Sequence, residues 1–168
     1  MATQEYAFKY GKGQICFALD PALVSGELKI KEYPPIPNAV EAFREAIRNP
    51  RQAKPLREIV RANQTVAFIV NDPTRVANSH VFMPLLLGEM KAIGVPDKNM
   101  FVIFAAGAHR ELTEAEMAEL VSPDVARRIK MYNTNAQDPA QFTYVGTTSR
   151  ENAVYFQTRV VEADPIIC

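Results

Sequence analysis

The sequence has no excess of charge of either sign, since 19 basic and 19 acidic side chains give a formal net charge of zero. A chain without a net field does little to concentrate a polyanion, so nucleic acid is not expected as a partner. No apolar run approaches the ~20 residues that cross a bilayer, and a membrane partner is not expected either. The N-terminus Met1–Glu5 lacks the basic and apolar pattern of a secretory signal. We therefore expect a soluble, cytoplasmic chain.

Cysteines, histidines and glycine-rich motifs are also scarce. Cys16 and Cys168 lie near opposite ends without a CxxC partner, which predicts reduced, structural thiols and no disulfide framework. His80 and His109 have no metal-ligand spacing, so the sequence assigns no metal ligand. Neither a GxGxxG nor a Walker sequence is present, which disfavours a dinucleotide site or a P-loop. No nucleophile elbow supports a hydrolase.

The apolar pattern that is present predicts one α/β domain over residues 1–168. Thr65–Val70 and Met100–Phe104 are typical of buried strands, and a helix over about 82–93 would complete a βαβ unit between them. Within this helix Phe82, Leu86, Met90 and Ile93 form the expected core stripe, and Pro84 is tolerable only in the first turn. Glycines at 11 and 13 predict an N-terminal hairpin between strands at 6–10 and 14–19.

Capping signals place the remaining elements. Helices are expected after Asn38, from Pro55, after Thr113 in a capping box with Glu116, and after Ser122. Further strands are expected at 129–132, 143–145, 154–161 and 166–168, and residues 20–37 are expected to be an extended connection. Together these elements predict a three-layer, Rossmann-like domain with a mostly parallel central sheet plus the N-terminal hairpin.

The residues that can carry chemistry follow the two buried strands directly. The first strand leads into Asn71–Arg75 and the second into Ala105–Arg110. Loops at the carboxyl ends of neighbouring parallel strands meet at one edge of a sheet, where α/β proteins build ligand sites. We therefore expect one crevice that gathers Asp72, Thr74, Arg75 and His109.

Each of these side chains suits a different task. Arg75 has a planar fork for a carboxylate or phosphate, and His109 can donate or accept a proton near neutral pH. Asp72 can orient either of them, and Thr74 adds a hydroxyl and a backbone donor. Gly107 has no side chain, so a ligand can approach its backbone.

Structural interpretations of the same residues stay open. Asp72 followed by proline and threonine is also ordinary turn chemistry. Arg75 or Arg110 could pair with an acidic neighbour. His80 is expected to be a satisfied surface histidine at the beginning of a helix.

At these positions the sequence resembles the N-terminal domain of the lactate racemase family, whose members use a nickel-pincer nucleotide to racemise or epimerise 2-hydroxy acids. The stretches that carry the resemblance are Tyr10–Gly13, Val70–Arg75 with Ser79–His80, and Ala105–Arg110 with Thr113–Glu114, supported by Asn49–Pro50 and Val161–Asp164.

The resemblance implies roles for the site residues. Arg75 would grip the substrate carboxylate, and His109 would be one of two acid/base histidines. Asp72, Thr74 and Gly107 would line the cofactor side. The cofactor would take the hydride from the substrate carbon while a histidine takes the hydroxyl proton.

The resemblance also implies what lies elsewhere. The second histidine, the lysine that tethers the cofactor and the nickel-ligating histidine would come after Cys168, in a C-terminal domain. The chain alone is therefore expected to be an inactive half of a two-domain enzyme. Ala106 and Thr134 stand where the family commonly has threonine and histidine, so close contacts are expected to differ there. A module that binds a small carboxylate or phosphate without catalysis is the alternative function.

Overall fold

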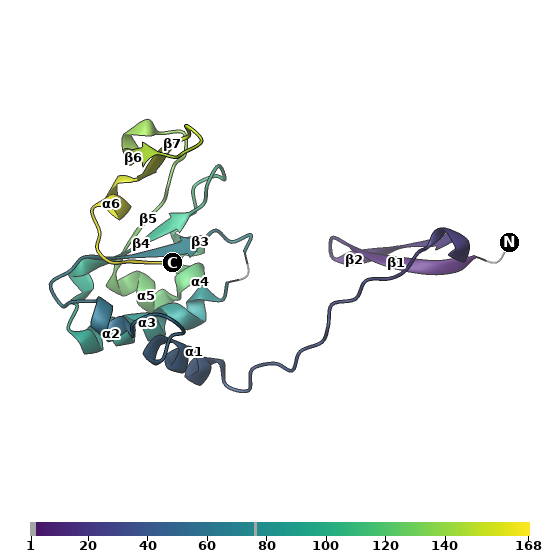
Figure 1. The fold of residues 1–168 in the computed structure, drawn as a ribbon, viewed down its shortest axis with the longest axis horizontal. Coiled ribbons are helices and arrows are strands. Elements are labelled where there is room, and N and C mark those ends of the chain that lie inside the picture. Colours follow the sequence, from purple (N-terminus) through teal and green to yellow (C-terminus); the bar gives the residue numbers. More distant parts are fainter. Residues whose placement is uncertain (1–2, 76) are drawn as a thin grey trace. The chain divides into compact units, whose positions relative to one another are not determined.

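The computed structural model describes residues 3–75 and 77–168, so Met1 and Ala2, part of the N-terminus that lacks a secretory pattern, lie outside it. The chain forms two compact units, Met1–Pro35 and Ile36–Cys168. The first unit is the predicted hairpin, with antiparallel strands β1 (Gln4–Tyr10) and β2 (Gly13–Leu19) (Figure 1). Gly11 has a φ of 57°, a conformation that glycine adopts without steric cost. The glycine signal therefore predicted this turn correctly.

The hairpin is amphipathic. Alternation along both strands gathers six large side chains on one face, and Phe8 stacks on Phe17 with ring centroids 5.1 Å apart. This face consists of Tyr6, Phe8, Tyr10, Ile15, Phe17 and Leu19. A short 3-10 turn at Pro21–Leu23 interrupts the extended connection that follows. Two strands alone rarely hold a stable fold, so this face favours packing against a further surface.

The second unit is built on a four-stranded parallel sheet in the order β5-β4-β3-β8. Its strands are β5 (Lys130–Tyr132), β4 (Met100–Ala105), β3 (Val66–Asn71) and β8 (Ile166–Ile167). All four carboxyl ends reach the same edge because the strands are parallel. The last pair of β3 and β4 is Asn71 with Ala105, so the loops after these strands begin side by side. The predicted α/β fold is confirmed.

Helices cover one face of this sheet (Figure 1). They are α1 (Ala39–Arg48), α2 (Leu56–Ile59), α3 (Ser79–Ile93), α4 (Glu114–Val121) and α5 (Pro123–Arg128), with a 3-10 turn at Asp97–Asn99 before β4. The predicted caps at Asn38, Thr113 and Ser122 are all present, whereas Pro55 precedes the first residue of α2 instead of being it. No helix of the described ranges is long and apolar enough to cross a membrane.

The core lies between this helical layer and the sheet. Alternate strand residues such as Phe68 and Phe104 are at most 1% exposed there.

Two predictions for α3 were wrong in detail. The helix begins at Ser79, so Pro84 lies inside it, beyond the first turn, where its ring leaves the carbonyl of His80 without a helical N–H partner. The deepest side chains are Met83, Leu87 and Met90, while Phe82 stacks on Phe43 of α1.

The opposite face of the sheet carries a smaller layer (Figure 1). It contains a 3-10 turn at Pro139–Gln141, the antiparallel pair β6 (Phe142–Thr147) and β7 (Ala153–Gln157), and helix α6 (Thr158–Val161). The predicted strand at 154–161 was wrong in its second half. The Gln157 side chain accepts hydrogen bonds from the amides of Arg159 and Val160 and so begins a helix. Cys16 and Cys168 are exposed free thiols, so neither packs inside the fold.

Candidate functional site

The loops after β3 and β4 bring a carboxylate and an imidazole together. Oδ2 of Asp72 lies 3.5 Å from Nδ1 of His109. A tight turn closed by the amide of His109 on the carbonyl of Ala106, at 3.0 Å, presents the imidazole to Asp72. The Asp72 side chain is 11% exposed and that of His109 is 56% exposed. The carboxylate is therefore sheltered, while the imidazole is open to a ligand.

The two carboxylate oxygens of Asp72 have different partners, because Oδ1 bonds to Thr74 in the loop after β3 and Oδ2 faces His109. Its Oδ1 accepts hydrogen bonds from the amide of Thr74, at 2.7 Å, and from the Thr74 hydroxyl. These hydrogen bonds hold the pKa of Asp72 below its usual value, and the charges of His109 and Arg75 act in the same direction against partial burial. Asp72 is thus a carboxylate at neutral pH. A carboxylate facing Nδ1 favours a proton on that nitrogen and leaves Nε2 as the basic atom.

Asp72, Thr74 and His109 line a hollow of about 380 Å³ together with Pro73, Arg110 and Leu112. Arg75, however, lines a second hollow of about 350 Å³ beside the beginning of α3. The amide of Arg75 donates to the carbonyl of Asp72 at 3.1 Å and so closes a turn over residues 72–75. The backbone reverses in this turn, between the side chains of Asp72 and Arg75. Arg75 and His109 therefore line two different hollows, which share Pro73 as a lining residue.

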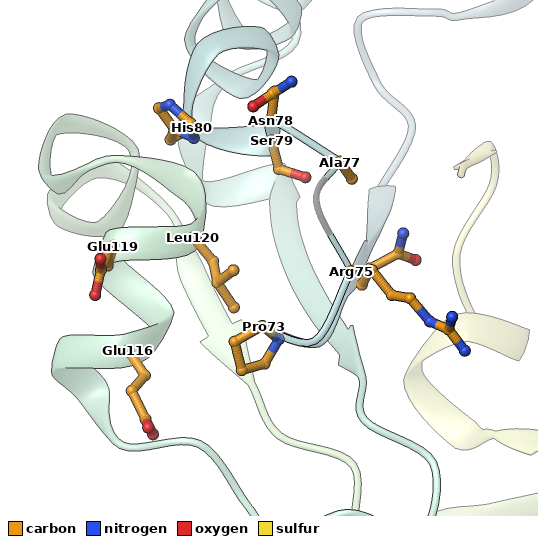
Figure 2. A pocket seen from close by; sticks show the side chains of 10 residues that line it. Pro73, Arg75, Ala77, Asn78, Ser79, His80, Glu116, Glu119 and Leu120 are labelled. Atoms are coloured by element: carbon orange, nitrogen blue, oxygen red, sulfur yellow. The ribbon is translucent and has the colours of Figure 1, made fainter. Parts of the chain in front are cut away.

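The guanidinium of Arg75 extends away from Glu116, Glu119 and His80, which line the other side of its hollow (Figure 2). It makes no ion pair with any residue that the structure describes. His80 is exposed, as expected of a histidine at the beginning of a helix. Of the two histidines, only His109 is paired with a carboxylate among the described residues.

Gly107 is the second residue of the turn from Ala106 to His109. Its φ of 60° is one that side chains rarely adopt, and no atom lies within 4 Å of the position that a Cβ would take. The backbone there is open, so it fits the close approach of a cofactor or substrate. No cluster of three or more metal-ligating side chains occurs in residues 3–75 and 77–168. The residues present thus fit the organic part of a cofactor, and we assign none of them to a metal.

Arg110 lines the same hollow as His109, and its guanidinium anchors the loop after β4 to Glu116. Its guanidinium donates to both carboxylate oxygens of Glu116, which in turn accepts from the amide of Thr113 at 2.9 Å. The hydrogen bonds from Arg110 and from the Thr113 amide lower the pKa of Glu116 to about 2. The structural interpretation of Arg110 was correct.

This anchor predicts a pH-dependent stability. A depressed carboxyl pKa stabilises the fold above the unfolded value, near 4.5, and the contribution disappears as the pH falls toward about 2. We therefore expect Glu116→Gln to lower the unfolding midpoint at pH 7, with the difference from the parent shrinking between pH 4.5 and 2. Urea unfolding at several pH values measures this. A difference that is the same at pH 7 and pH 2.5 would contradict it.

Asn133 is a site-supporting residue that the sequence patterns did not reveal. It follows β5 and hydrogen-bonds both backbone groups of Leu112, 21 residues earlier in the chain. The sequence could have placed Asn133 at the ligand edge of the sheet, because it is a polar residue directly after a third predicted strand. It could not have shown that Asn133 bonds to Leu112.

Comparison with known proteins identifies the family of the chain. The profile of the lactate racemase N-terminal domain matches residues 10–168. Lactate racemase of Thermoanaerobacterium thermosaccharolyticum is 24% identical over 160 residues, which are 94% of this chain and 37% of that protein. Lactate racemase of Lactiplantibacillus plantarum is 24% identical over 127 residues, 76% of this chain and 30% of that protein.

Solved structures show the same fold. The lactate racemase apoprotein from T. thermosaccharolyticum matches with a TM-score of 0.81 at 23% identity, over 97% of this chain and 38% of that one. A Thermotoga maritima protein matches with a TM-score of 0.57 at 19% identity, over 76% and 31%. The chain thus spans less than two-fifths of the length of these relatives. With its profile match over nearly the whole sequence, the chain belongs to the lactate racemase N-terminal domain family.

Proposed function

We propose that this chain is the N-terminal catalytic domain of a lactate racemase-like enzyme that racemises or epimerises a 2-hydroxy acid. The observation that carries the proposal is the pairing of Asp72 and His109, 3.5 Å apart, at the carboxyl edge of a parallel sheet. A carboxylate behind an exposed imidazole is the arrangement that a general base needs. Membership of the lactate racemase N-terminal domain family supports the same class of reaction.

His109 is the proton-transfer group in this proposal. With Nδ1 held toward Asp72, its Nε2 accepts the hydroxyl proton of the substrate as the carbon loses hydride. Asp72 stabilises the imidazolium that results, because its lowered pKa keeps it charged. For the opposite enantiomer, a second acid/base histidine, expected in the C-terminal domain, would supply the hydroxyl proton. A nickel-pincer nucleotide, when bound, would supply the acceptor and donor for the hydride.

The chain would hold the cofactor and substrate from one side only. Asp72, Thr74 and the open backbone at Gly107 would line the cofactor, and Arg75 would bind the substrate carboxylate. The relatives are more than twice as long as this chain, so residues of a C-terminal domain would complete the site. We propose that the hairpin and the α/β unit together form the N-terminal half of that two-domain enzyme.

A racemisation assay tests the proposed reaction. The complete protein, loaded with cofactor, is incubated separately with the D- and L-forms of lactate and of larger 2-hydroxy acids, and the loss of optical purity is followed by chiral chromatography. We expect both enantiomers of at least one substrate to interconvert to a racemic mixture. No interconversion of any of them by cofactor-loaded protein would refute the proposal.

The second candidate function is binding of a small carboxylate or phosphate without turnover. It is favoured by Arg75, which borders a hollow and whose guanidinium makes no ion pair among residues 3–75 and 77–168. Titration calorimetry with lactate and inorganic phosphate, run beside the assay above, separates the two. Saturable binding with no interconversion selects the binding module.

Substitution of Arg75 should weaken substrate capture. Loss of a bidentate, charge-assisted contact costs about 1.5–3 kcal/mol, so Arg75→Ala should lower kcat/KM for the 2-hydroxy acid by roughly 10- to 150-fold, mostly through KM. Arg75→Lys should recover only part of this because an ammonium lacks the planar fork. Steady-state kinetics measure both, and Arg57→Ala, on an exposed helix position, is the matched control. An unchanged KM in Arg75→Ala would remove Arg75 from the substrate site.

A further inference from the structure

The side-chain amide of Asn133 pairs with both backbone groups of a single residue. The amide of Leu112 donates to Oδ1 of Asn133 at 3.0 Å, and Nδ2 of Asn133 donates to the carbonyl of Leu112 at 2.8 Å. Asn133 directly follows β5, while Leu112 belongs to the loop after β4. The contact therefore links two loops at the ligand edge of the sheet. It satisfies both backbone groups of one residue, as pairing with a neighbouring strand would.

Leu112 connects this contact to the site. It is 6% exposed, packs in the core, and lines the same hollow as Asp72 and His109. The His109 end of the loop is closed by its own turn onto Ala106. Asn133 thus restrains the other end, at Leu112, of the four-residue segment that begins at His109. Without Asn133, two backbone groups beside a buried side chain would lose their partners, which favours a shifted loop.

From this geometry we infer that Asn133 is a positioning residue, which holds the loop 109–112 so that His109 faces Asp72. Its effect on rate rests on the proposed function of His109. Its effect on the loop does not, because the two hydrogen bonds exist whatever the imidazole does. A displacement of a catalytic group by about 1 Å can cost about 10²-fold in rate, so a restraint of this kind is worth a large factor.

Two variants and one control test the inference. Asn133→Ala removes both hydrogen bonds. Asn133→Asp keeps the size of the side chain and an acceptor for the Leu112 amide but no donor for its carbonyl, so it serves if the alanine variant fails to fold. Asn135→Ala is the matched control, because Asn135 also accepts a backbone hydrogen bond, from Gln137 at 2.9 Å, and makes no hydrogen bond with Leu112 in the described part of the chain.

The first readouts use this chain without cofactor. Amide hydrogen exchange measures how well the backbone N–H of Leu112 is protected. Long-range proton–nitrogen NMR shows which ring nitrogen of neutral His109 carries the proton. For both Asn133 variants we expect the Leu112 amide to exchange about tenfold faster relative to the core amides of β3 and β4. We also expect a smaller share of neutral His109 to carry its proton on Nδ1. The control should match the parent in both.

The last readout is kinetic and uses the complete, cofactor-loaded protein. We expect the Asn133 variants to lower kcat by about 10- to 100-fold while KM changes by less than about threefold. Equal acceleration of exchange at Leu112 and in β3 and β4 would overturn the inference, since it would show general destabilisation. An unchanged ring signature would overturn it as well. A parent protein that interconverts no 2-hydroxy acid would refute the proposed function, while exchange and ring signature would still decide the role of Asn133.

Discussion

His109→Ala should lower the rate of racemisation by the complete enzyme by about 10²- to 10⁴-fold, the range for loss of a positioned general acid or base. The fall should appear in kcat more than in KM, because His109 acts on a proton in transit and Arg75 binds the carboxylate. His109→Gln should lose as much, since an amide keeps hydrogen bonding but transfers no proton. Steady-state rates with both enantiomers, measured over pH 5–9, provide the test.

A histidine outside the pair with Asp72 controls for loss of an imidazole as such. His80 is exposed in the first turn of α3, and Figure 2 shows it across its hollow from Arg75. We expect His80→Ala to keep its kcat within about threefold of the parent, because this imidazole, which lines the Arg75 hollow, pairs with no carboxylate among the described residues. If His109→Ala also keeps that rate, the imidazole of His109 has a structural role and the proposed proton transfer is wrong.

Phe104→Ala should be the most destabilising of the substitutions considered, by about 3–5 kcal/mol. Phe104 is fully buried on the helix-covered face of β4, one residue before the strand ends at Ala105. Its removal leaves a cavity directly beneath the loop that carries His109. Urea unfolding of this chain, followed by circular dichroism, measures the loss.

Phe156 offers a matched substitution outside the core. It is 52% exposed on β7, so Phe156→Ala should cost less than about 1 kcal/mol. A loss of under 1 kcal/mol for Phe104→Ala would mean that the core between sheet and helices is not the main source of stability of this unit.

Prediction from the sequence succeeded where a signal is local. Asn38, Thr113 and Ser122 each cap the backbone amides of the next turn, and this chemistry is complete within four residues. The hairpin turn and the two apolar strands are likewise encoded within short stretches. The boundary at Gln157 was missed because β-branched residues favour a strand, while its side-chain cap favours a helix.

The site was predictable in part for the same reason. Consecutive strands of a βαβ unit pair as neighbours, so the loops carrying Asp72 and His109 could be placed side by side from the sequence. The separation of Arg75 from them depends on the direction of one turn. The role of Asn133 depends on a contact between loops 21 residues apart, which leaves no periodic trace in the sequence.

The sequence by itself determined the types of element, their order and the residue types at the ligand edge, because helix caps, glycine turns and apolar periodicity act over a few neighbouring residues. Only the tertiary structure decided that Asp72 faces His109, that Arg75 lines a different hollow from both, and that Asn133 holds Leu112. Those relations arise from hydrogen bonds and packing between distant segments. Their geometry exists only once the sheet has brought the carboxyl ends of its strands to one edge.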